Sequence, residues 1–129
     1  MQSGVIADFG IERVICASAG NSGQAIAYAG RTAGIPVTVF AATTANDAKI
    51  ARIQDLGADV VPVGNDFDAA KETARAFATG TPGVRFVEDA ADRETVAGAG
   101  TIGIELAPEK LDVLLVPLRN GALINGIAT

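Results

Sequence analysis

The sequence contains no histidine, and Cys16 is its only cysteine. Without histidine, catalytic triads built on imidazole and most transition-metal sites are excluded. A single cysteine can form neither an internal disulfide nor a cysteine zinc cluster, so Cys16 is interpreted as a small buried residue. We therefore expect no metal site in this chain.

Positive charge and long apolar runs are also scarce. Ten basic residues against 15 acidic ones give a net charge of −5, and the basic residues are scattered, so no nucleic-acid partner is expected. No apolar stretch approaches the roughly 20 residues that span a bilayer. Residues 1–5 lack the basic and apolar regions of a signal peptide. These absences predict a cytoplasmic protein without a membrane partner.

The remaining composition suits an α/β core. The chain has 129 residues, of which 49% are hydrophobic and 5% aromatic, and abundant Ala and Gly let helices approach a sheet closely. Five short apolar runs rich in β-branched residues predict buried strands at residues 13–17, 37–41, 59–63, 84–87 and 113–117. Helical patterns lie between them. The expected fold is therefore a three-layer αβα arrangement around a parallel sheet of four to five strands.

Several residues indicate where the expected helices begin and end. Asp66 is expected to cap a helix whose apolar face carries Phe67, Ala70, Ala74 and Phe77. Gly34 and Gly57 are expected to end the two helices before it.

A further helical pattern, around residues 96–106, is rich in glycine. Glycine inside a helix costs about 1 kcal/mol relative to alanine, so Gly98, Gly100 and Gly103 indicate close packing or an interrupted helix, and packing is favoured. Three carboxylates precede or open this helix: Asp89, Asp92 and Glu94. A carboxylate there can cap the helix or favour its positive end, and we favour capping over acid–base catalysis.

One turn that leaves a predicted strand and enters a helix is a candidate anion site. It consists of Ser18, Ala19, Gly20 and Asn21. Successive backbone N–H groups at a helix start attract an anion such as a carboxylate. The alternative is an ordinary capped turn between a strand and a helix, because one glycine-rich turn is a weak signal.

A second turn of this kind consists of Arg119, Asn120, Gly121 and Ala122. Its amides can hold a phosphate, to which Arg119 would add positive charge, and the alternative is a solvated loop. Neither turn has the form of a nucleotide-binding fingerprint, and no Gly-Lys-Ser/Thr occurs anywhere, which disfavours a P-loop nucleotide hydrolase. Three lysines are expected to be solvated: Lys49, Lys71 and Lys110.

In this order and at this spacing, the segments resemble the fold-type-II pyridoxal-phosphate enzymes, and within them threonine dehydratase, serine dehydratase and serine racemase. The family's Ser-x-Gly-Asn loop is similar to residues 18–21. Further matches are residues 34–37, 49–60 and 98–105. Residues 116–117 and 123–124, which flank the phosphate loop, match as well. The similarity runs from about Val14 to the C-terminus.

The resemblance implies a role for each turn. Residues 18–21 would bind the carboxylate of a small amino acid through backbone amides, and the Asn21 side chain would contact the ring oxygen of pyridoxal 5'-phosphate. Residues 119–122 would hold the cofactor's phosphate. The family's reaction eliminates water from threonine or serine and gives a 2-oxo acid and ammonia. Residues 1–91 would form the family's small α/β domain and residues 92–129 the start of its large cofactor-binding domain, separately or packed as one unit.

Two departures from the family pattern bear on catalysis. Nothing that resembles the family's Ser-x-Lys-x-Arg-Gly-Ala segment, which carries the Schiff-base lysine, precedes Ser18, so we assign no catalytic residue and expect the chain alone to be inactive. The family's phosphate loop is usually a Gly-rich tetrad, and here the bulky Arg119 occupies its first position, where it bears on close approach of the cofactor. Most of the large domain is expected to be missing, which would leave apolar surface open and predicts a homo-oligomer.

Two other functions remain compatible with the sequence. One is a non-catalytic amino-acid-binding or regulatory module that keeps the carboxylate loop. The other is a free-standing, doubly wound nucleotide-binding domain, for which the family similarity would be accidental.

Overall fold

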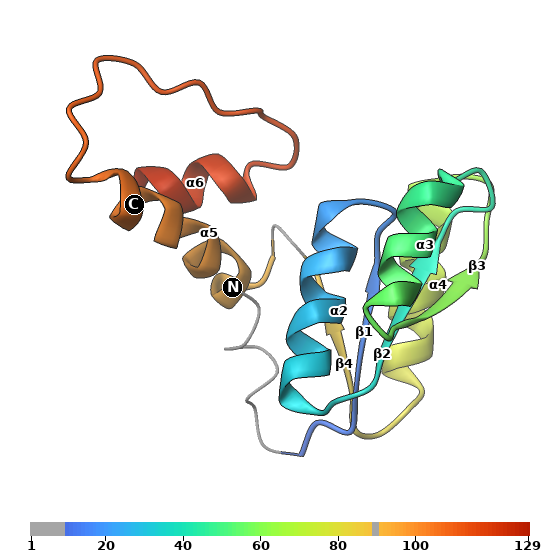
Figure 1. The fold of residues 1–129 in the computed structure, drawn as a ribbon. Helices are drawn as coiled ribbons and strands as arrows, with labels where there is room; N and C mark the ends of the chain where they lie inside the picture. The colour runs from blue at the N-terminus through green and yellow to red at the C-terminus, as the bar shows by residue number, and fades with distance from the viewer. Residues whose placement is uncertain (1–9, 89–90) are drawn as a thin grey trace. The chain divides into compact units, whose positions relative to one another are not determined.

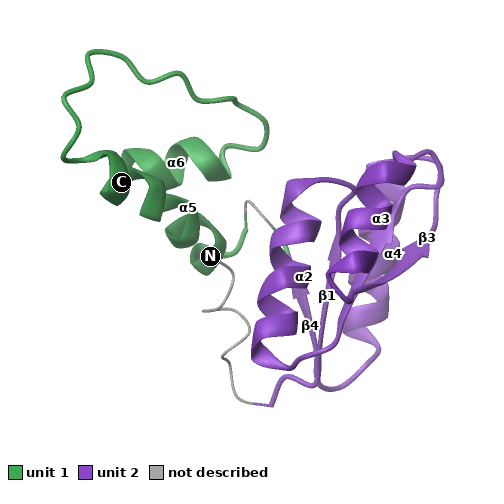
Figure 2. Cartoon of the chain, in the orientation of Figure 1, with its two compact units in different colours: residues 1–2, 88–129 green, residues 3–87 purple. Residues whose placement is uncertain are grey.

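The computed structural model describes residues 10–88 and 91–129. Asp89 and the segment at residues 1–5, both used above, lie outside these ranges. The chain divides into two compact units, with residues 3–87 in unit 2 and residues 1–2 and 88–129 in unit 1 (Figure 2). This division falls a few residues before the domain boundary that the sequence suggests after residue 91.

Unit 2 is built on a four-stranded parallel sheet, as the sequence predicts. Its strands are β1 (Arg13–Ala17), β2 (Val37–Ala41), β3 (Asp59–Pro62) and β4 (Val84–Val87), in the spatial order β3-β2-β1-β4. Every pair is parallel. Four of the five predicted runs, at residues 13–17, 37–41, 59–63 and 84–87, correspond to these strands within one residue.

Helices cover both faces of this sheet, which gives the expected three layers (Figure 1). Helices α2 (Asn21–Ala33) and α3 (Asp47–Asp55) pack on the face that carries Val14, Cys16 and Val39. Helix α4 (Phe67–Thr79) packs on the opposite face, against Ile15 and Phe40. Because successive strand residues point to opposite faces, neighbours in β1 contribute to different cores. Cys16 is buried, as predicted.

The predicted helix ends in unit 2 are confirmed. The Asp66 carboxylate accepts a hydrogen bond from the Ala69 amide at 2.8 Å and caps α4. Gly34 ends α2 in the left-handed conformation, with φ of 72°, and Gly57 follows α3 with φ of 90°. Glycine suits both positions because a Cβ atom is strained at such angles.

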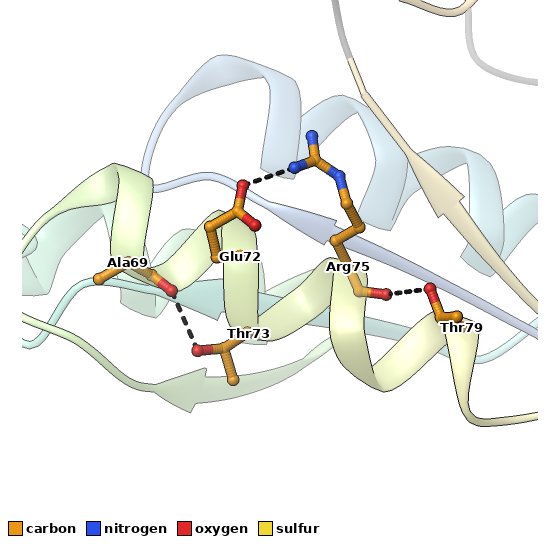
Figure 3. Close-up of polar contacts among 5 residues, drawn as sticks. All are labelled: Ala69, Glu72, Thr73, Arg75 and Thr79. Atoms are coloured by element: carbon orange, nitrogen blue, oxygen red, sulfur yellow. Dashed lines mark hydrogen bonds and ion pairs between the residues drawn. The ribbon is translucent and has the colours of Figure 1, made fainter.

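Several polar contacts join residues within α4 (Figure 3). The hydroxyls of Thr73 and Thr79 donate to the carbonyls of Ala69 and Arg75, and Arg75 forms an ion pair with Glu72 at 2.5 Å. An exposed pair of this kind contributes at most about 1 kcal/mol. The helix is therefore held in place mainly by its apolar face. On that predicted face Ala70 and Ala74 are fully buried, whereas Phe67 and Phe77 are 43% and 47% exposed.

Unit 1 contains helices α5 (Arg93–Leu106) and α6 (Ala122–Ala128), which pack through glycines. A Cβ atom at Gly100 would lie 2.9 Å from the Gly126 carbonyl oxygen, and one at Gly103 would lie 2.8 Å from the Ile127 carbonyl oxygen. Both distances are shorter than real Cβ contacts. The prediction of close packing is therefore confirmed for Gly100 and Gly103, and α5 is continuous through both.

The fifth predicted strand, residues 113–117, is wrong. This segment belongs to a long loop between α5 and α6 that contains no strand (Figure 1). Val113 and Leu115 are largely exposed, although the apolar sequence is typical of a buried strand. A strand needs a neighbour for its backbone hydrogen bonds, and the described part of unit 1 contains no other strand.

The expected capping role of Asp92 also needs correction. Asp92 occupies the N-cap position of α5, but its side chain makes no capping hydrogen bond to the helix. Its carboxylate accepts instead from the Glu88 backbone amide at 2.7 Å, which fixes the turn before the helix. Glu94 lies in the first turn, where a negative charge favours the positive end of the helix.

Candidate functional site

The strand order of unit 2 indicates where a ligand would bind. The chain places β2 and then β3 on one side of β1, and then returns to place β4 on the other side. In open parallel sheets, ligands bind beyond the carboxyl ends of the strands, where the order of the strands reverses. That reversal occurs at β1. The loop that leaves the carboxyl end of β1 is the Ser18–Asn21 turn singled out from the sequence.

Hydrogen bonds of Ser18 hold this turn in place. Ser18 is 8% exposed, and its amide extends the β1–β2 ladder by donating to the Phe40 carbonyl at 3.1 Å. Its hydroxyl oxygen accepts hydrogen bonds from the amides of Gly20 at 3.1 Å and Gly23 at 3.0 Å. A hydroxyl oxygen has two lone pairs, so both acceptor positions are used. The hydroxyl proton therefore remains as the group that Ser18 can donate.

Gly23 lets the first turn of α2 come this close to Ser18. A Cβ atom at Gly23 would lie 3.2 Å from the Ser18 hydroxyl oxygen and 3.0 Å from Cδ1 of Ile53 on α3. The turn therefore depends on a small residue at this position as well as on the serine. The pattern Ser-x-Gly-x-x-Gly contains both residues, but the hydrogen bonds that join them are visible only in the structure.

Two backbone amides of the turn are available to a ligand. Among the residues that the structure describes, the amides of Ala19 and Asn21 have no hydrogen-bond partner. Asn21 is the first residue of α2 and is exposed. Both amides thus lie at the positive end of a 13-residue helix, beside a buried hydroxyl. This arrangement fits an anion of the size of a carboxylate.

The second turn, residues 119–122, begins α6. Gly121 has φ of 88°, a left-handed conformation that favours glycine, and its carbonyl accepts from the Asn125 amide. The side chain of Asn120 accepts from the Ala122 amide at 3.2 Å. The Ala122 amide, which was expected to hold a phosphate, is therefore bonded within the turn. The order of residues did not predict this contact.

The remaining groups of this turn fit a phosphate. The amides of Asn120 and Gly121 have no hydrogen-bond partner among residues 91–129, and Arg119 lies beside them with an exposed side chain. A phosphate is recognised by backbone amides together with a guanidinium group, and both are present here. The two turns belong to different units, and each is complete within its own unit.

The lysines lie outside both turns. Lys49 is exposed on α3, Lys71 is half-buried on α4, and Lys110 is exposed in the loop after α5. No group of three acidic, histidine or cysteine side chains that would suit a metal ion occurs in the described parts of the chain. None of the helices formed by the described residues combines the length and the apolar character needed to cross a membrane.

Unit 1 also has a groove of about 770 Å³ along α5 and α6, away from residues 119–122. It is lined mainly by apolar surface, including Val96, Gly100, Ile104 and Gly126. None of the residues assigned to the two turns lines it.

Comparison with known proteins gives consistent matches. A model of the pyridoxal-phosphate-dependent enzymes matches residues 3–129. The chain is 42% identical over 118 residues to an L-threonine ammonia-lyase of Geobacter sulfurreducens and 39% identical over 117 residues to that of Thermotoga maritima. These matches cover 90% and 89% of this chain, and the chain spans 29% of the length of each relative.

Solved structures agree with these matches. The processed form of threonine deaminase isoform 2 from Solanum lycopersicum superposes with a TM-score of 0.82 at 33% identity, covering 92% of this chain and 35% of that one. A pyridoxal 5'-phosphate-dependent aspartate racemase superposes with a TM-score of 0.82, also at 33% identity, covering 91% of this chain and 36% of that one.

Proposed function

Because the chain belongs to the family of pyridoxal-phosphate-dependent enzymes, we propose that it is the part of a threonine or serine dehydratase that holds the substrate carboxylate and the cofactor phosphate. The reaction would be α,β-elimination of water from the amino acid, giving a 2-oxo acid and ammonia. The observation that carries the proposal is the Ser18–Asn21 turn at the end of β1, where the strand order reverses. Two of its amides have no hydrogen-bond partner in the described part of the chain.

The first turn would bind the amino acid through its carboxylate. The amides of Ala19 and Asn21 would donate to the carboxylate oxygens, with Gly20 shaping the backbone between them. The Ser18 hydroxyl keeps one proton to donate, because both of its lone pairs are engaged by Gly20 and Gly23. The Asn21 side chain, which is exposed, would contact the ring oxygen of the cofactor.

The second turn would hold the phosphate of pyridoxal 5'-phosphate. The amides of Asn120 and Gly121 and the charge of Arg119 supply the contacts, while the Ala122 amide is already held by the Asn120 side chain. When bound, the cofactor withdraws electrons from the amino acid's α-carbon. The residues of this chain would bind and orient the two anionic groups.

The positions of the lysines support a binding role rather than complete catalysis for the chain alone. None of Lys49, Lys71 and Lys110 belongs to either turn. Covalent attachment of the cofactor requires a suitably placed amine. We therefore expect added pyridoxal phosphate to produce no lysine adduct that borohydride can trap. A single trapped lysine would contradict this expectation.

A non-catalytic amino-acid-binding module is the second candidate, and the same lysine positions favour it. Both candidates require the carboxylate turn, but only the dehydratase requires phosphate recognition at residues 119–122. Calorimetry with serine and threonine tests the shared requirement, and phosphorus NMR of pyridoxal phosphate tests the other. Amino-acid binding without any response of the phosphate would favour the second candidate.

The proposal includes a cytoplasmic location and a homo-oligomeric enzyme that binds neither nucleic acid nor membranes. Support for self-association comes from the exposed apolar side chains of unit 1, such as Ile104, which is 75% exposed. Light scattering at increasing concentration tests it, and a clean monomer throughout would count against it. Cell fractionation tests the location.

NMR titration of the labelled chain tests the carboxylate turn directly. L-threonine should shift the amide signals of Ala19, Gly20 and Asn21, whereas 1-aminopropan-2-ol, which lacks the carboxylate, should not. Asn21→Asp should weaken the effect because it adds a negative charge beside the two amides. Gln24→Glu adds the same charge one turn further along α2 and serves as the control. Equal shifts with both compounds would contradict the proposal.

A further inference from the structure

Unit 1 contains two asparagine–glycine pairs, Asn120-Gly121 and Asn125-Gly126. Asparagine is a thermolabile residue, because the backbone nitrogen of the next residue can attack its side-chain carbonyl carbon. Glycine at the next position has no Cβ atom and therefore hinders this attack least. The two pairs have the same intrinsic reactivity, so any difference between them comes from the fold.

The first pair is held in a conformation that suits this attack. The Asn120 side-chain oxygen accepts a hydrogen bond from the Ala122 amide at 3.2 Å. The ring that this bond closes contains the peptide bond between Asn120 and Gly121, so the side-chain carbonyl lies beside that peptide bond. The Ala122 amide also stabilises the negative charge that develops on the oxygen during attack. Because Asn120 is exposed, water and solvent base reach it.

The nitrogen that would attack is available as well. The Gly121 amide has no hydrogen-bond partner in the described part of the chain. Gly121 has φ of 88° and precedes the first residue of α6, so its nitrogen is not restrained by a helical hydrogen bond. Its proton can therefore pass to solvent base without the loss of a contact that stabilises the fold.

The second pair lies inside α6 and is held differently. A Cβ atom at Gly121 would lie 3.4 Å from the Asn125 side-chain nitrogen, so the Asn125 side chain points back along the helix and away from Gly126. Gly126 is buried, and its position inside the helix commits its amide to the i→i−4 hydrogen-bond pattern. Asn125 is as exposed to solvent as Asn120 in kind, so access of water does not distinguish the two pairs.

We propose that Asn120 is a site of spontaneous deamidation and that its modification weakens phosphate binding at residues 119–122. The Gly121 nitrogen loses its proton to solvent base and bonds to Cγ of Asn120. The bond from Cγ to Nδ2 breaks, and Nδ2 leaves as ammonia with a proton from water. Water then opens the five-membered succinimide ring at either carbonyl and gives aspartate or isoaspartate. The overall reaction consumes one water and requires no oxidant or cofactor.

The effect on the phosphate rests on the function proposed above, whereas the deamidation itself does not. Both products place a carboxylate, which is ionised at neutral pH, in the turn that would hold the phosphate. This charge repels the phosphate. Isoaspartate also lengthens the backbone by one carbon atom before Gly121, which displaces the Gly121 amide. The fraction of the chain that can hold the cofactor should therefore fall as the protein ages.

Incubation of the full chain tests the deamidation without any ligand. The chain is kept folded or in urea, and mass spectrometry with peptide mapping measures aspartate and isoaspartate at both pairs. Cleavage after Glu109 at mildly acidic pH, which suppresses further deamidation, leaves both pairs in one peptide. In the folded chain Asn120 should react at least about tenfold faster than Asn125, because the second pair reacts only when α6 opens locally. In urea the two rates should be similar. Equal rates in the folded chain would overturn the proposal.

Two substitutions test the effect on the phosphate. Phosphorus NMR should show that the affinity for pyridoxal phosphate falls at least about fivefold in the deamidated chain and in Asn120→Asp, because like charges repel. Asn65→Asp makes the same chemical change at an exposed residue of unit 2 and is the matched control, which should leave the affinity unchanged. Unchanged affinity in Asn120→Asp would overturn the effect on the phosphate. A chain that deamidates selectively at Asn120 but never binds pyridoxal phosphate would contradict the proposed function and would still establish the modification site.

Discussion

The hydroxyl oxygen of Ser18 lies 3.0 Å from the backbone nitrogen of Gly23 and accepts its hydrogen bond. The same oxygen also accepts from Gly20, so one buried side chain fixes the end of β1, the turn and the first turn of α2. The side chain thereby engages two amides that a ligand would otherwise satisfy. The amides left for a ligand, those of Ala19 and Asn21, are oriented by a contact that does not itself require the ligand.

Ser18→Ala should destabilise unit 2 by about 1–3 kcal/mol, because the amides of Gly20 and Gly23 would lose a buried acceptor. Urea unfolding of the unliganded chain measures this. Thr32→Ala is the control. The Thr32 hydroxyl is exposed on α2, the helix that also contains Gly23, and it donates to the Tyr28 carbonyl. This substitution should change the free energy of unfolding by less than about 0.5 kcal/mol. Equal effects of the two variants would show that the Ser18 contacts do not stabilise the turn.

Gly126→Ala should disrupt the packing of α5 against α6. A Cβ atom there would overlap the Val96 carbonyl oxygen and would lie 2.9 Å from the Gly100 nitrogen, and backbone atoms cannot yield as a side-chain end can. We expect a loss of about 1–3 kcal/mol in unit 1, measured by hydrogen exchange of the α5 amides. Asn125→Ala, at an exposed position of the same helix, is the control. Unchanged exchange in Gly126→Ala would contradict the packing described here.

Asn120→Gly should strengthen binding of pyridoxal phosphate to the second turn. The substitution frees the Ala122 amide, and one additional hydrogen bond is worth about 0.5–1.5 kcal/mol, or roughly a 2- to 12-fold gain in affinity. Phosphorus NMR measures it. Pyridoxal without the phosphate is the control ligand and should show no gain. Weaker phosphate binding in the variant would mean that the Asn120 side chain shapes the turn for the phosphate instead of competing with it.

Asp66→Ala should cost about 1 kcal/mol, because the Ala69 amide at the start of α4 would lose its capping acceptor. Asp68→Ala removes the same charge from the first turn without removing a cap, and should cost only about 0.3–1 kcal/mol. Urea unfolding compares the two variants. A larger loss in Asp68→Ala than in Asp66→Ala would show that charge, and not the capping hydrogen bond, is the dominant effect.

Much of unit 2 could be predicted from the sequence because its signals are local. The runs that form β1, β2 and β4 are mostly β-branched and apolar, which is typical of buried strands, and their predicted bounds were correct. Asp66 precedes an apolar period of about 3.6 residues, so its capping role was also readable. The carboxylate turn was identified by residue type, and its place after β1 followed from the expected parallel sheet.

Contacts between side chains and backbone amides could not be predicted in the same way. The sequence predicted that Asp92 caps α5, but the Asp92 carboxylate accepts a hydrogen bond from the Glu88 amide instead. The path of the backbone before the helix decides which amide lies within hydrogen-bond distance. The Asn120 side chain likewise accepts from the Ala122 amide across Gly121, which adopts a left-handed conformation that its residue type permits but does not dictate. Such choices depend on distances of a few tenths of an ångström, which no spacing rule specifies.

The sequence by itself determined that the chain builds a parallel αβα core, that Ser18 to Asn21 leave a strand end, and that residues 113–117 are apolar enough to be buried. Only the tertiary structure decided that the Ser18 hydroxyl accepts hydrogen bonds from two amides of its own turn and helix, and that residues 113–117 form a loop instead of a strand. The physical reason is the same in both cases. The sequence shows that an apolar segment favours burial and that a hydroxyl can form hydrogen bonds. The fold decides which residues lie close enough to bury the segment or to bond the hydroxyl.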